Sequence, residues 1–198
     1  MNAAGKKIGF GLTGSFCTLE KSLEQMEKLA LLGADIYPFI SSIVAVTDTR
    51  FGKAEYFKNR IEHITGKKCV TTIVDAEPVG PKNFLDIMVV LPCTGNTLAK
   101  LANGITDTSV AMAVKAQLRN NKPVLMGIAT NDGLSANGKN IGLLHNTDNV
   151  FFIPYGQDDP QKKTNSLICL MDLFIPALEA ALDGVQLQPV LTVHSMQG

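Results

Sequence analysis

One short stretch, LDIMVVL at residues 85–91, does most to limit what this chain can fold into. Apart from Asp86, every residue in the stretch is apolar. A short, continuous apolar run is typical of a strand that is buried on both faces, as in the centre of a parallel sheet. The sequence therefore predicts a central strand here, in a sheet that helices cover on both sides.

Further apolar runs alternate with helical patterns along the 198 residues. Strands are predicted over residues 6–12, 35–41, 69–74, 85–91, 122–128 and 149–154. Helices are predicted over residues 19–32, 54–64, 107–119 and 165–182, the last interrupted at Pro176, with a short helix ending at Gly104. This alternation predicts the α/β class, with a three-layer, doubly wound parallel sheet in a single domain. We expect a core from about residue 7 to 182 and a C-terminal extension over residues 184–198.

The composition argues against several classes of protein. Lys and Arg together number 18, as do Asp and Glu, so there is no electrostatic case for binding nucleic acid or an anionic membrane. The four Cys form no C-x-x-C pair and the three His have no ligand spacing, which predicts reduced thiols and no metal site. With no signal-like start and no stretch long enough to span a membrane, we expect a cytoplasmic protein.

Small and polar residues follow four of the predicted strands. They form the segments TGSF (13–16), ISS (40–42), PCTGNT (92–97) and ATNDG (129–133). Ligands of open α/β sheets bind beyond the carboxyl ends of the strands, so these segments are expected to meet there. Thr94, Asn96 and Thr97 crowd one turn, although capping a helix takes only one side chain. The surplus indicates a site for a polar, planar ligand, with Gly95 giving it room.

The segment GFGLTG matches the dinucleotide pattern G-x-G-x-x-G only formally. Gly9 and Gly11 lie inside the predicted strand, and Asp35 precedes the second strand instead of ending it, so a nicotinamide fingerprint is disfavoured. Gly14 and Ser15 at a helix N-terminus favour an anion such as phosphate. A plain helix cap at Ser15 or Thr18 explains the same residues and stays open.

Other reactive side chains carry weaker hypotheses. The histidines His63, His145 and His194 are expected to be solvated rather than catalytic. Cys93 has no base nearby in the sequence, so we expect it to pack in the core. Asp158 and Asp159 are expected in a solvated loop that could cover a site.

The helix predicted over residues 107–119 is apolar or small around most of its circumference. The residues concerned are Val110, Ala111, Met112, Ala113, Val114, Ala116 and Leu118. A surface helix normally keeps a broad polar face. We therefore expect a neighbouring copy of the chain to cover one side of this helix. Burial of the whole helix within one chain is the alternative.

The stretch PCTGNTLAKLANGITD resembles the signature of the flavoprotein family, which includes homo-oligomeric flavin-containing Cys decarboxylases and flavin prenyltransferases. The TGS after the first strand and the Ser after the second also fit, and the resemblance runs from about residue 7 to 182. It implies a Rossmann-like, flavodoxin-type sheet, a trimer or a multiple of trimers, and FMN bound at a subunit interface.

The resemblance also implies roles for individual residues, carried over by position. Gly14, Ser15 and Ser41 would hold the FMN phosphate. The ribityl chain and flavin ring would lie along Pro92, Thr94, Asn96 and Thr97, with Asn131 matching an Asn that the family carries after the next strand.

The chain departs from the family where the known chemistries reside. Decarboxylases carry a His before the central strand, where this chain has PVGPKN, and P-x-M-N-x-x-M where IATNDGL keeps only Asn131. Prenyltransferases place a phosphate-binding Arg about where Thr130 stands. These losses favour a third role. The resemblance implies that of an oxidoreductase subunit, with a separate partner subunit that binds NADP or NAD. Two alternatives remain: a stand-alone FMN-dependent decarboxylase of a cysteine-derived substrate, and a flavin-free supporting subunit.

Overall fold

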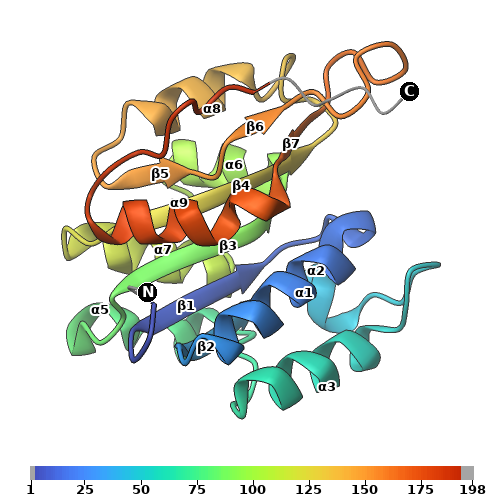
Figure 1. Ribbon diagram of the computed structural model, residues 1–198. Coiled ribbons are helices and arrows are strands. Elements are labelled where there is room, and N and C mark those ends of the chain that lie inside the picture. Colours follow the sequence, from blue (N-terminus) through green and yellow to red (C-terminus); the bar gives the residue numbers. More distant parts are fainter. Residues whose placement is uncertain (1–2, 193–198) are drawn as a thin grey trace.

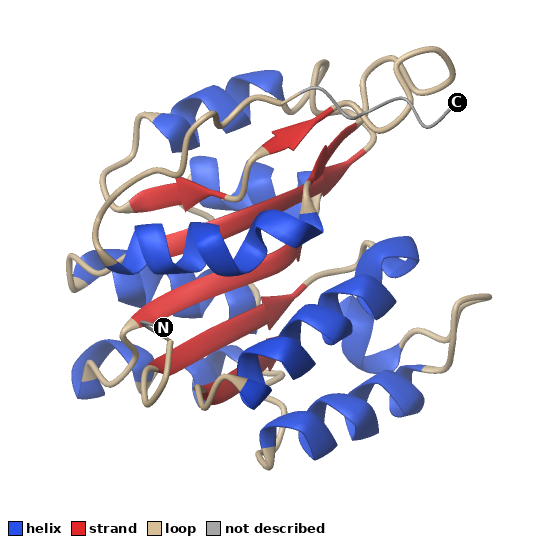
Figure 2. Cartoon of the chain, in the orientation of Figure 1, coloured by secondary structure: helices blue, strands red, loops and turns tan. Residues whose placement is uncertain are grey.

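The computed structural model describes residues 3–192, which form a mixed sheet with helices on both faces (Figure 1 and Figure 2). The strands within this range are β1 (Lys7–Leu12), β2 (Asp35–Ile40), β3 (Ile87–Cys93), β4 (Val124–Thr130), β5 (Val150–Phe152), β6 (Tyr155–Gly156) and β7 (Leu167–Cys169). The predicted α/β, Rossmann-like architecture is therefore confirmed. No helix in the described range is both long enough and apolar enough to span a membrane.

Five of the strands run parallel, in the order β2-β1-β3-β4-β5. The chain reverses its direction of winding between β1 and β3, so the carboxyl ends of these two strands flank the switch point of the sheet. The strands β6 and β7 were not predicted. They form an antiparallel pair, and β7 pairs with the last two residues of β4. The sheet is therefore mixed, instead of purely parallel.

The helices are α1 (Phe16–Leu31), α2 (Ser42–Val46), α3 (Ala54–Thr65), α4 (Ile73–Ala76), α5 (Val79–Lys82), α6 (Gly95–Ala102), α7 (Ser109–Arg119), α8 (Gly138–His145) and α9 (Phe174–Leu182), with a 3-10 turn at Met171–Leu173. The helices α1 and α9 lie on one face of the sheet, and α6 and α7 lie on the other (Figure 1).

Two sequence-based predictions of elements are wrong. Of the strand predicted over residues 69–74, only Val70 pairs, in an isolated bridge with Phe39, and the Thr72 hydroxyl then caps α4. The helix predicted from residue 165 begins at Phe174, because residues 167–169 are recruited to the sheet as β7. Pro176 does not interrupt that helix. It lies in the first turn, where a backbone N–H has no partner to lose.

The core lies between the three central strands and the helices on each side. Every residue of β3 is buried, and the side chains of Ile8, Phe10 and Leu12 in β1 are completely buried. Phe10 meets Phe174 of α9 edge to face, with the ring centroids 5.9 Å apart. On the other face Gly11 allows α7 to approach, because a Cβ there would lie 2.9 Å from Val110 Cγ1.

The apolar helix α7 is covered within the chain itself. Its Val110, Ala111, Ala113, Val114 and Ala116 are all buried. One side packs on the sheet, and the short helices α4 and α5 pack against it as well. The expectation that a neighbouring copy must cover this helix is therefore wrong. The sequence pattern missed the cover because the four-residue helices α4 and α5 are too short to show a helical period.

The C-terminal extension runs back along the outer edge of the sheet. The Gln186 side chain donates to Phe152 O and accepts from Phe152 N, both at 2.8 Å. Further along, Tyr155 N donates to Val190 O at 2.9 Å, and Thr192 N donates to Tyr155 O at 3.0 Å. Residues 193–198, with His194, lie outside the described range.

We expect the substitution Phe10→Ala to lower the free energy of unfolding by about 3–5 kcal/mol, because it removes a buried ring and leaves a cavity against Phe174. Urea denaturation would measure the loss. Leu31→Ala is the control, because that side chain is 87% exposed and its loss should have a much smaller effect. Equal losses in the two variants would contradict this view of the core.

Candidate functional site

A buried hydroxyl joins the two loops that flank the switch point. Thr13, the residue after β1, donates through Oγ1 to Pro92 O at 2.8 Å and accepts from Thr94 N at 3.0 Å. This side chain therefore holds the segment TGSF against the segment PCTGNT, although Thr13 and Pro92 lie 79 residues apart in the sequence. Sequence reasoning did not single out Thr13. Its position directly after an apolar strand, inside the TGS segment, was the available signal.

The predicted phosphate-binding residues come together at the ends of β1 and β2. Ser15 is the N-cap of α1, but its hydroxyl makes no capping hydrogen bond, so the plain-cap interpretation fails for this side chain. Ser41 is buried and its Oγ has no hydrogen-bond partner. A Cβ on Gly14 would lie 2.8 Å from Ile43 Cγ2, so glycine lets this loop pass close to α2 without displacing that side chain. A buried hydroxyl without a partner is costly, and a ligand that bonds it removes the cost.

Among the residues after β3, some cap helix α6 or are buried, and one side chain is left without a hydrogen bond. Thr94 caps α6 by accepting from Thr97 N, and the hydroxyls of Thr94 and Thr97 lie 3.1 Å apart. Pro92 and Thr97 are buried, and the Pro92 carbonyl is bonded to Thr13. Asn96 is exposed and makes no hydrogen bond to the described residues. Asn96 is therefore not the cap, and its amide is free to contact a ligand.

A polar cluster lies beneath the first turn of α6. The sequence pointed to the segment ATNDG that supplies Thr130 and Asp132, but not to these residues individually or to Asn137 and Asn140. The Asp132 carboxylate accepts from Thr130 Oγ1 and from Asn137 Nδ2, at 2.8 and 2.9 Å to its two oxygens. Asn140 Nδ2 donates to Asn137 Oδ1 at 2.8 Å, and Asn137 and Asn140 are buried. The space at Gly95 is filled by this cluster. The expectation that Gly95 makes room for a ligand is therefore wrong.

Asn131, the remaining predicted residue, is exposed at the end of β4 and faces the loop before β7. It lines a polar hollow of about 330 Å³ together with Lys162, Lys163, Thr164 and Asn165. The loop is ordered by an ion pair between Lys163 Nζ and Asp158 Oδ2 at 2.8 Å. The hydrogen bond that Lys163 donates to Asp158 raises the pKa of Lys163. Asp159 accepts from Lys162 N at 3.0 Å, so both carboxylates bond within this loop instead of merely being solvated in it.

The thiols and imidazoles show no arrangement for nucleophilic catalysis in the described range. Burial raises the pKa of Cys93, which is completely buried, and raises that of Cys169 to about 12. His63 is exposed, as expected. His145 is exposed as well, although one face of its ring stacks on Phe152 with centroids 4.0 Å apart and its Nε2 lies 2.9 Å from Tyr155 Oη. No group of His, Cys, Asp and Glu in residues 3–192 is arranged to hold a metal ion.

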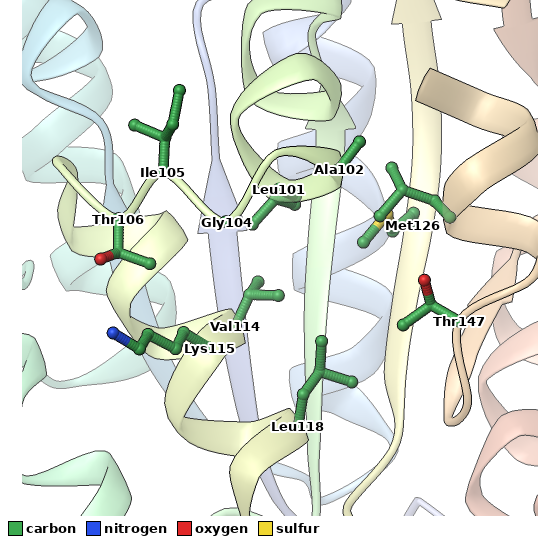
Figure 3. Close-up of a pocket in the computed structure, with 11 residues that line it drawn as sticks. Leu101, Ala102, Gly104, Ile105, Thr106, Val114, Lys115, Leu118, Met126 and Thr147 are labelled. Carbon is green, nitrogen blue, oxygen red and sulfur yellow. The ribbon is translucent and has the colours of Figure 1, made fainter. Parts of the chain in front are cut away.

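An apolar pocket of about 220 Å³ lies between α6, α7 and α8 (Figure 3). Its walls include Leu101, Val114, Leu118 and Met126. None of the predicted site residues lines it, and it has few polar groups to orient a ligand. The candidate site is therefore the carboxyl edge at the switch point, where helix N-termini and uncommitted polar side chains converge.

Known proteins share the family, the fold and much of the sequence of this chain. The model of the family described as Flavoprotein matches residues 1–178. The chain belongs to the flavoprotein family. The B subunit of dipicolinate synthase from Bacillus subtilis (strain 168) is 52% identical over 194 residues, which cover 98% of this chain and 96% of that protein.

Solved flavoprotein structures extend the comparison. The crystal structure of the B subunit of dipicolinate synthase from Bacillus halodurans C has a TM-score of 0.90 at 52% identity, covering 98% of this chain and 99% of that chain. The FMN-dependent cysteine decarboxylase SpaF has a TM-score of 0.68 at 20% identity, covering 91% and 97%. The first likeness extends over nearly the whole of this flavoprotein, and the second supports the shared fold.

The imidazole of His145, partly covered by Phe152 and Tyr155, predicts a pH dependence of stability. Burial lowers its pKa from the ordinary value of 6.5, so the unfolded chain binds the proton more readily. Stability that is present above about pH 6.5 should therefore be lost as the pH falls further. Between about pH 7.5 and about pH 5.5, wild type should lose more stability in urea denaturation than His145→Gln. His63→Gln controls for the loss of one imidazole, and identical pH profiles for wild type and His145→Gln would refute the prediction.

Proposed function

We propose that this chain acts as the B subunit of dipicolinate synthase. Together with a nicotinamide-binding A subunit that uses NADP or NAD, it would oxidise a dihydrodipicolinate-type precursor to dipicolinate, in the cytoplasm of the mother cell during sporulation. The observation that carries the proposal is 52% identity to proteins of that name, over nearly the whole of both chains. The absence of a nicotinamide fingerprint supports a partner, because Gly9 and Gly11 lie within β1.

FMN is the cofactor that the site fits best. The unpaired Ser41 hydroxyl and the N-terminus of α1 suit its phosphate, and the free Asn96 amide beside α6 suits polar atoms of its ribityl chain or ring. When bound, FMN would supply a two-electron acceptor for oxidation of the substrate ring. The residues of this chain would hold the phosphate at one end and orient the flavin at the other.

A decarboxylase role is the weaker candidate. The corresponding chemistry uses a His base, and the two described histidines are placed elsewhere: His63 on the exposed side of α3 and His145 against Tyr155 of β6. A positioned base of this kind contributes typically about 10²–10⁴-fold to rate. The geometry therefore favours the oxidoreductase subunit over a stand-alone decarboxylase.

We also propose that the subunit self-associates into a trimer or a multiple of trimers. Apolar side chains are exposed beside the candidate site, with Ile43 at 50%, Val46 at 77% and Phe51 at 45% exposure. Ile43 also contacts the loop of Gly14. A second copy that covers this surface would close the phosphate end of the site. Light scattering that gives the mass of a single chain would contradict self-association.

We expect Asn96→Ala to weaken FMN binding by about 1–3 kcal/mol, because a polar group of the ligand loses its partner. Its effect on stability should be small, since Asn96 is not the cap of α6. Fluorescence titration and urea denaturation would measure the two effects. Thr72→Ala, which removes the cap of α4, is the control that should lose about 1 kcal/mol of stability with unchanged FMN affinity. Unchanged FMN affinity in Asn96→Ala would contradict a role for Asn96 at the flavin.

The proposed reaction predicts dependence on a second subunit. Purified chain with FMN and precursor should form no dipicolinate, and activity should appear when the A subunit and a nicotinamide cofactor are added. Ultraviolet absorbance of dipicolinate follows the product. The same preparation should not decarboxylate a peptidyl or pantothenoyl cysteine. Full dipicolinate formation by this chain alone, or decarboxylation at an enzymatic rate, would overturn the proposal.

A further inference from the structure

We propose that Asp132 is a positioning residue, which fixes the first turn of α6 against the ligand through a hydrogen-bonded set with Thr130 and Asn137. The inference rests on the proposed flavin site and adds residues to it. None of the three was predicted as a site residue, and Asp132 belongs to the loop after β4, a different strand from the one that leads into α6.

The contact with α6 is unusually close. A Cβ on Gly95 would lie 2.5 Å from Asn137 Nδ2, 2.5 Å from Thr130 Oγ1 and 2.7 Å from Asp132 Oδ1. Cβ atoms do not tolerate such distances, so only glycine allows the turn to rest directly on the polar cluster. Gly95 is the first residue of α6, and the free amide of Asn96 follows it. Any shift of the cluster therefore moves the ligand-facing turn.

The cluster is rigid because its hydrogen-bond donors are paired with acceptors inside it. Asp132 accepts from the Thr130 hydroxyl and takes both contacts from the Asn137 amide, which in turn accepts from Asn140 Nδ2. Asn103, directly after α6, donates through Nδ2 to Asn140 Oδ1 at 3.4 Å. The set thus reaches both ends of α6. Its carboxylate also lies beside the N-terminus of that helix, where negative charge is favourable.

Removal of the carboxylate should loosen the turn without touching the phosphate end of the site. In Asp132→Ala, Thr130 and Asn137 lose their acceptor, and buried polar groups without partners rearrange. We expect the affinity for FMN to fall about tenfold, and the affinity for riboflavin, which lacks the phosphate, to fall by the same factor. Ser41→Ala should instead weaken FMN and leave riboflavin almost unchanged.

The exchange Asp132→Asn with Asn137→Asp provides the rescue. An amide at 132 can accept from Thr130 and donate to a carboxylate at 137, which can also accept from Asn140, so each residue of the set keeps a partner and only one of the two contacts between 132 and 137 is lost. Both flavin affinities should return to within about threefold of wild type, since no buried polar group is left unpaired. Asn137→Ala is a second test that keeps the carboxylate, and it should resemble Asp132→Ala.

The measurements are equilibrium titrations with FMN and with riboflavin, the visible circular dichroism of the bound flavin, and urea denaturation. Asp148→Ala, an exposed Asp before β5, is the matched control and should keep wild-type affinity. Equal flavin affinities in wild type, Asp132→Ala and Asn137→Ala would overturn the positioning role. The proposed function would still stand in that case, because the wild type binds FMN. Loss of stability without any change in affinity or dichroism would also overturn it. A wild type that binds neither flavin would overturn the positioning role and the proposed FMN cofactor, and would leave the role as a B subunit, which rests on sequence identity.

Discussion

The Thr13 hydroxyl connects the two halves of the sheet at the point on which the site depends. It donates to the carbonyl of Pro92 and accepts from the backbone of Thr94, so the loop after β1 and the loop after β3 share one buried side chain. The chain reverses its direction of winding here, and ligands of open α/β sheets bind at such a point. Without a direct link, the candidate site would be bounded by two independent loops. With it, the N-termini of α1 and α6 keep a fixed separation, which a ligand spanning both of them requires.

The two ends of the candidate site differ in how many of their polar groups are free. At the α1 end, the structure leaves hydrogen-bonding capacity unused. The Ser15 hydroxyl makes no capping bond and contacts Cys17 Sγ at 3.9 Å, and the buried Ser41 hydroxyl has no partner. At the α6 end, nearly every polar group is committed to the protein, and Asn96 is the free exception among the described residues there. A site with open capacity at one end and a braced turn at the other suits an elongated ligand with an anionic group and a polar ring.

The comparison of prediction with structure shows which elements a single sequence can reveal. The strands at residues 85–91 and 122–128 were predicted because burial on both faces leaves a continuous apolar run. The strand predicted over residues 69–74 failed, since a β-branched run is also compatible with one bridge at Val70 and a short capped helix. The strands β6 and β7 were missed because two- and three-residue strands carry no period, and their pairing partners decide them.

The sequence by itself determined the class of fold, the edge of the sheet where polar residues gather, and the family signature after β3, because these depend on local patterns and on strand polarity. Only the tertiary structure decided which polar residues are free and which are engaged. Asn96 and Thr97 are neighbours of similar polarity, yet one is exposed and the other is buried against Thr94. In the structure, Asp132 and Asn137 fill the space beside Gly95, although they lie 37 and 42 residues after Gly95 in the chain. Hydrogen-bond partners of that kind depend on how strands and loops pack in space, and no local pattern encodes them.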